Sequence, residues 1–93
     1  MRTDKEIKEQ VDGLKVIAAK PTFRRTTLFH DNNVEAIEAQ VEVLEHRLTE
    51  EDVFDRQDMG YYTEHVSNIA RDAATWLVGD SEDTPVDGWK GLY

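Results

Sequence analysis

The chain has 93 residues, no cysteine and a net charge of −9 at neutral pH. This length supports one small domain, and the lack of cysteine excludes disulfides, thiol catalysis and thiolate metal sites. No long apolar run occurs, so we expect no signal peptide, no transmembrane span and a cytoplasmic location.

The charge is unevenly distributed along the chain. Positions 1–30 hold seven basic and four acidic residues, whereas positions 31–93 hold four basic and sixteen acidic residues. This acidic majority argues against direct binding to nucleic acid or to an anionic membrane, because phosphate contacts require lysine and arginine. It favours contact with a basic protein surface, although a surface that only keeps the domain soluble has the same composition.

The first predicted element is a helix over residues 4–19. Thr3 and Glu6 have capping-box spacing, and Pro21 disfavours helical geometry just after the helix. Apolar residues recur on one face at Ile7, Val11, Leu14 and Ala18.

A basic loop follows within residues 20–31. Lys20, Arg24 and Arg25 could bind a phosphate or carboxylate through forked guanidinium contacts, which would make a small-anion or nucleotide site. The alternative is that these arginines pair with the surplus carboxylates of the chain itself.

A second helix is predicted over residues 33–48, with Asn32 as its N-cap and Glu35 at the third position. Its apolar residues follow heptad spacing: Val34, Ile37, Val41, Leu44 and Leu48. This stripe fits either a structural homodimer or packing against the first helix in a hairpin.

Two further helices are predicted. Thr49 caps a short helix near residues 50–57, and Thr63 caps a longer one over residues 63–78 that ends at Gly79. The apolar face of the longer helix consists of Val66, Ile69, Ala70, Ala73, Trp76 and Leu77.

Residues 80–93 form a polar, acidic C-terminal tail beyond a helical domain of residues 1–79. The tail carries Trp89, Leu92 and Tyr93, which either fold back on the helices or bind a partner. The predicted fold is all-α: a small helical bundle in which a helical hairpin is crossed by a third helix, with a short extra helix and this tail.

The sequence shows no enzyme motif. The three histidines lack the spacing of metal ligands on a helix, and neither a catalytic Ser–His–Asp order nor a phosphate-binding glycine loop is visible. We therefore expect no catalytic residue, no metal and no cofactor.

Carboxylates are ordered along the second predicted helix. Their spacing of three and four residues makes a stripe about 15 Å long. We define the acidic ridge as these residues and their continuation, namely Glu35, Glu38, Glu42, Glu45, Glu50, Glu51, Asp52 and Asp55. Such a ridge can imitate the charge of a nucleic-acid backbone and occupy a basic groove on another protein, although it also fits the ordinary polar face of an amphipathic helix.

Several segments together resemble small acidic hypothetical proteins of bacteriophages and prophages. These segments are Asp31-Asn32-Asn33 with residues 36–44, residues 50–56, residues 73–79, and the closing Pro85 with Gly88-Trp89-Lys90. The resemblance implies an accessory, non-virion role in the bacterial cytoplasm, and by analogy binding to a host protein. It assigns no functional residue.

The leading hypothesis is a non-enzymatic interaction module that docks the acidic ridge on a basic host protein. Exposed aromatic residues near Tyr61, Tyr62 and Trp89 would supply affinity. The alternatives are the small-anion binder and the structural homodimer.

Overall fold

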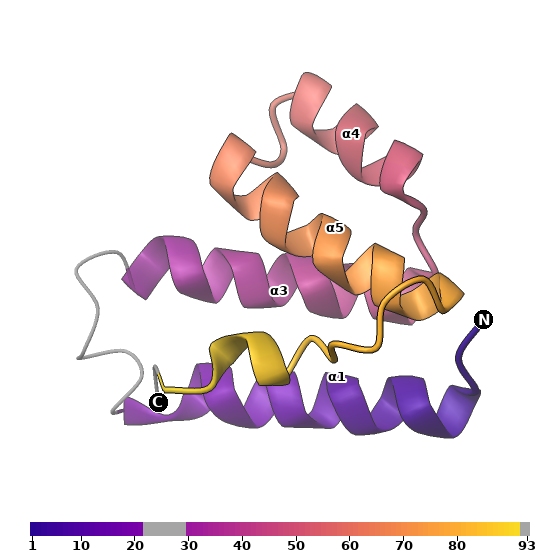
Figure 1. Cartoon of the computed structure of the whole chain (residues 1–93). Coiled ribbons are helices and arrows are strands. Elements are labelled where there is room, and N and C mark those ends of the chain that lie inside the picture. Colours follow the sequence, from indigo (N-terminus) through magenta and orange to yellow (C-terminus); the bar gives the residue numbers. More distant parts are fainter. Residues whose placement is uncertain (22–29, 92–93) are drawn as a thin grey trace.

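Helices make up most of the described part of the chain (Figure 1). The computed structural model describes the backbone of residues 1–21 and 30–91, and the side chains of residues 1–21 and 33–91. Within these ranges the regular structure is helical and no strand occurs, which confirms the predicted all-α class. The elements are α1 (Asp4–Ala19), α3 (His30–His46), α4 (Glu50–Asp58), α5 (Glu64–Val78) and the short 3-10 helix η1 (Asp87–Trp89).

The predicted caps at Thr3, Thr49, Thr63 and Gly79 are confirmed. The hydroxyl groups of Thr3, Thr49 and Thr63 each accept a hydrogen bond from the backbone N–H three residues later. At Thr3 and Thr49 the acidic side chain at that position also accepts a bond from the cap backbone, which completes a capping box. Gly79 ends α5 with a φ of 95°, a left-handed conformation that glycine adopts without strain.

The predicted bounds of α3 are wrong at both ends. The helix begins two residues before Asn32, so Asn32 lies inside the helix and is not its cap. A residue that suits a cap does not start a helix when the preceding backbone is already helical. The helix ends early because Arg47 has a φ of 51° and its guanidinium donates hydrogen bonds to the carbonyl oxygens of Leu44 and Glu45, at 3.0 Å each.

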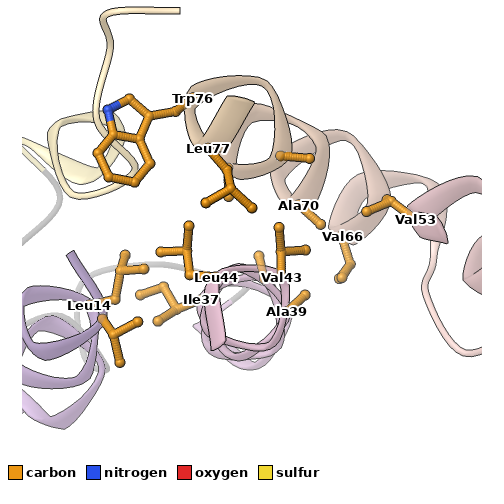
Figure 2. Packing of buried hydrophobic residues seen from close by; sticks show 14 of the residues in the cluster. Leu14, Ile37, Ala39, Val43, Leu44, Val53, Val66, Ala70, Trp76 and Leu77 are labelled. Carbon is orange, nitrogen blue, oxygen red and sulfur yellow. The ribbon is translucent and has the colours of Figure 1, made fainter. Parts of the chain in front are cut away.

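Helix α3 lies at the centre of the bundle. It runs antiparallel to α1, α5 crosses it on another side, and α4 packs on α5 (Figure 1). Leu14 of α1, Leu44 of α3 and Leu77 of α5 are fully buried and point toward a common core (Figure 2). The hairpin crossed by a third helix is therefore present as predicted.

The buried face of α3 is wider than the predicted heptad stripe. Ile37 and Leu44 of that stripe are buried, but Val43 is buried as well. Helix α3 is covered by both α1 and α5, and contact on two sides requires a broader apolar face than contact with a single helix.

Residues 80–91, here called the C-terminal segment, lie against α1 and α3. Trp89 is only 5% exposed, and its indole N–H donates a hydrogen bond of 2.8 Å to Oε1 of the buried Gln40. The Gln40 amide in turn donates to the carbonyl oxygen of Ile69 at 3.4 Å, and the backbone N–H of Val86 donates to Oε1 of Gln10 at 3.1 Å. Polar contacts from two helices thus fix this segment. Leu92 and Tyr93 lie outside the described residues.

Gly13 allows the C-terminal segment to approach α1 closely. A Cβ atom at this position would lie 2.8 Å from Cγ2 of Val86, closer than ordinary contact. Glycine inside a helix costs about 1 kcal/mol relative to alanine. The packing of Val86 gives a physical reason for its presence here.

Arg2 joins the beginning of the chain to the end of α5. Its backbone N–H donates to the carbonyl oxygen of Leu77 at 2.9 Å. Its guanidinium donates to the carbonyl oxygens of Trp76 at 2.9 Å and Ser81 at 2.6 Å, and lies 4.9 Å from the centre of the Trp76 ring system. Because the last carbonyls of a helix lack partners within the helix and attract cations, Arg2 stabilises both α5 and the C-terminal segment.

Candidate functional site

The structure divides the acidic ridge into two parts. Glu35, Glu38 and Glu42 border a groove between α3 and the start of α5. The remaining carboxylates lie toward the other end of α3 and along α4, and several of them contact their own chain.

The second part of the ridge is used largely within the fold. Glu45 Oε1 lies 3.3 Å from Lys15 Nζ of α1, and Glu50 accepts a hydrogen bond of 2.9 Å from the Thr75 hydroxyl of α5. Asp52 closes the capping box of α4. Glu51 and Asp55 are exposed. These contacts shorten the stretch of ridge that is open to a partner.

The first part of the ridge forms one wall of a groove of about 300 Å³. Glu35 and Glu38 are exposed on α3, and Tyr61, which lines the same groove, is 77% exposed. We call this site the tyrosine groove, and its lining residues are Glu35, Glu38, Ala39, Glu42, Tyr61, Tyr62 and Val66.

Glu42 has a different role from the two exposed glutamates. The Tyr62 hydroxyl donates a hydrogen bond to Oε1 of Glu42, and Arg56 Nε donates to the same oxygen at 3.0 Å. Burial raises the pKa of Tyr62, and the bond to the Glu42 carboxylate raises it further. Arg56 balances the charge of Glu42, so this residue positions Tyr62 and adds little free charge to the groove.

The turn between α4 and α5 holds Tyr61 outside the core. Gly60 has a φ of 84°, which reverses the chain direction after α4. The backbone N–H groups of Tyr61 and Tyr62 both donate to the carbonyl oxygen of Arg56, at 2.9 and 3.3 Å. Met59, which precedes this turn, is 67% exposed. The turn therefore presents an aromatic and a thioether side chain to solvent from a fixed backbone.

The predicted role of Trp89 as an exposed aromatic is wrong. Its ring is buried and bonded to Gln40, because the bundle supplies both an apolar contact surface and an acceptor for the indole N–H. Of the predicted aromatic set, the structure brings Tyr61 and Tyr62 together with the acidic ridge.

The predicted anion site cannot be placed as a whole. Lys20 follows α1 and makes an interaction within the chain. Arg24 and Arg25 lie outside the described residues.

Sequence reasoning missed the internal partners of the ridge. Arg56 is fourteen positions from Glu42, and Lys15 belongs to a different helix from Glu45. Such contacts depend on how helices are packed, and no local spacing rule indicates them. The sequence indicated only in general terms that arginines of the chain pair with its surplus carboxylates, without saying which residues pair.

The described ranges hold no group of three or more histidine or acidic residues arranged to bind a metal ion. In the same ranges no helix combines the length and the apolar character needed to cross a membrane. Comparison of the chain with protein-family models, with curated proteins and with solved structures finds no match.

Proposed function

We propose that this chain is a non-enzymatic protein-interaction module that docks the tyrosine groove on a basic surface of another protein. One observation carries this proposal. Tyr61 is 77% exposed on a hydrogen-bonded turn and lines the same groove as the exposed Glu35 and Glu38.

The two kinds of side chain support binding in different ways. Carboxylates attract a basic partner, raise its association rate and fix its orientation. A tyrosine ring supplies contact area at a small cost in conformational entropy, and its face attracts the cationic group of arginine or lysine. The net charge of −9 adds long-range attraction toward a basic partner.

The internal pairing of the ridge favours this mode over imitation of a nucleic-acid backbone. A nucleic-acid mimic needs an extended row of free charge, whereas Glu42 and Glu45 are balanced by Arg56 and Lys15. We place the docking charge on Glu35 and Glu38, beside Tyr61. Following the resemblance to phage and prophage proteins, we propose that the partner is a host protein in the bacterial cytoplasm.

The test begins with affinity capture of partners from a bacterial lysate at low and high salt. A captured protein is then purified and titrated against the wild-type chain and against Glu35→Gln/Glu38→Gln. The matched control is Glu9→Gln/Asp80→Asn, which removes two exposed charges elsewhere.

We expect the groove variant to weaken binding about tenfold, and the control by about twofold or less. Binding to the wild-type chain should also fall as salt rises, because exposed charges are screened. Equal losses in the two variants would refute docking through the tyrosine groove.

A further inference from the structure

A second and larger groove lies between α3, α5 and the C-terminal segment. Its volume is about 620 Å³, within the range typical of small-molecule sites. It is distinct from the tyrosine groove, with which it shares no lining residue. We call it the tail groove.

The tail groove has an apolar floor. Pro85 and Trp89 are buried in it, and Ile69 is half-buried beside them. Gln40 also reaches the floor, but its amide is already bonded to the Trp89 indole and to the Ile69 carbonyl. The floor is therefore preformed and offers mainly apolar contact to a ligand.

The walls of the tail groove are negatively charged. Asp72 of α5 and Asp83 and Asp87 of the C-terminal segment line it, and the described lining includes no lysine or arginine. Lys90 Nζ lies 3.3 Å from Asp87 and offsets part of that charge. Asp72 and Asp83 remain as the exposed pair.

The charge of Asp83 acts on the Asp72 carboxyl group. Partial burial raises the pKa of Asp72, and the negative charge of Asp83 adds to that rise, while Arg71 acts in the opposite direction. A cation between the two carboxylates would relieve their repulsion. A phosphate or another anion would be repelled by both carboxylates.

We propose that the tail groove binds a small aliphatic diamine or polyamine. The ammonium groups would lie at Asp72 and Asp83, and the methylene chain between them would cover Ile69 and Trp89. A simple metal ion would interact with the carboxylates but make no contact with the apolar floor. A groove with both acidic walls and an apolar floor therefore favours an organic cation. This site stands independently of the proposed docking function.

The probe for the test is spermidine, titrated calorimetrically into the full chain, with magnesium chloride at matched ionic strength as a control for charge screening. The test variant is Asp72→Asn/Asp83→Asn, and the matched control is Glu9→Gln/Asp58→Asn, which removes two exposed charges outside the groove. Two-dimensional NMR of the wild-type chain, with and without spermidine, locates the site even if the test variant fails to fold.

We expect saturable binding of one spermidine per chain with a Kd of about 1 mM or tighter. The test variant should weaken it about tenfold and the control by about twofold or less. Chemical-shift changes should centre on Ile69, Asp83 and Trp89. The proposal is overturned by no saturable binding, by equal weakening in both variants, by magnesium binding as tightly as spermidine, or by shift changes elsewhere.

Discussion

Trp89 at the end of η1 and Tyr61 in the turn after α4 each follow a glycine, yet the first is 5% exposed and the second 77%. Trp89 enters the bundle because Gln40 accepts its indole hydrogen bond. Tyr61 stays outside because the neighbouring Tyr62 occupies the half-buried place beside Glu42. The buried aromatic residue thus has a partner for its polar group, as is usual for tryptophan and tyrosine in a core.

The same contrast extends to the surroundings of each residue. The C-terminal segment that carries Trp89 is bonded to the side chains of Gln10, Gln40 and Arg2. Around Tyr61, Glu35 and Glu38 are exposed. One region therefore contributes mainly to stability, while the other is available to a partner.

The largest effect should come from truncating Trp89, with the same change at Tyr61 as the comparison. Trp89→Ala should lower the free energy of unfolding by about 3–5 kcal/mol, because it leaves a cavity and removes the partner of Gln40. Tyr61→Ala should change it by about 0.5 kcal/mol or less. Urea unfolding of both variants measures this difference, and similar losses would contradict the contrast.

The hydrogen bond between Gln40 and Trp89 can be tested separately. Gln40→Leu keeps much of the side-chain volume but leaves the indole N–H buried without this acceptor, and should cost about 2 kcal/mol. Combining it with Trp89→Phe should cost less than the sum of the two single changes, because both remove the same bond. Strict additivity in urea unfolding would exclude a coupled pair.

Arg2 should have a smaller effect. Arg2→Ala removes the charged donors at the end of α5 and should cost about 1.5 kcal/mol. Lys5→Ala, an exposed cation on α1, serves as the control and should cost about 0.5 kcal/mol or less. Thermal unfolding compares the two, and an equal drop in Tm would show that Arg2 acts only through general charge.

The smallest effect is the pH dependence of the stability that Asp52 of the acidic ridge contributes, compared with that of the adjacent Glu51. The hydrogen bond from the Thr49 backbone lowers the pKa of Asp52. Asp52 therefore stabilises the folded chain above its unfolded pKa of about 4, and this contribution is lost as the pH falls through the lower folded pKa. The stability difference between the wild type and Asp52→Asn should shrink in acid.

The control for this change is Glu51→Gln, since Glu51 is exposed and does not occupy the capping position. Unfolding measured from neutral to acidic pH should show little change in its difference from the wild type. A matching acid dependence in both variants would contradict the special position of Asp52.

Much of the fold follows from local rules in the sequence. The caps at Thr3, Thr49 and Thr63 need only residues within one helical turn. Gly79 ends α5 because its own backbone adopts a left-handed conformation, which glycine accepts without strain. The apolar faces follow from helical periodicity. These features were predictable because their causes lie within a few residues of each other.

The remaining features depend on contacts between distant segments. Arg2 binds carbonyl groups more than seventy positions away, and Gln40 bonds to Trp89 across forty-nine positions. The division of the acidic ridge likewise depends on Arg56 and Lys15 reaching it from other helices. Sequence spacing predicts a stripe of carboxylates, but only helix packing decides which of them remain open.

Nitration of tyrosine by tetranitromethane, mapped by mass spectrometry in the free chain and in its complex with a purified partner, tests the central claim most directly. Tyr61 should be modified in the free chain and protected in the complex. Tyr62 should react poorly in both, because burial and the bond to Glu42 raise its pKa. Equal nitration of Tyr61 with and without the partner would contradict docking through the tyrosine groove.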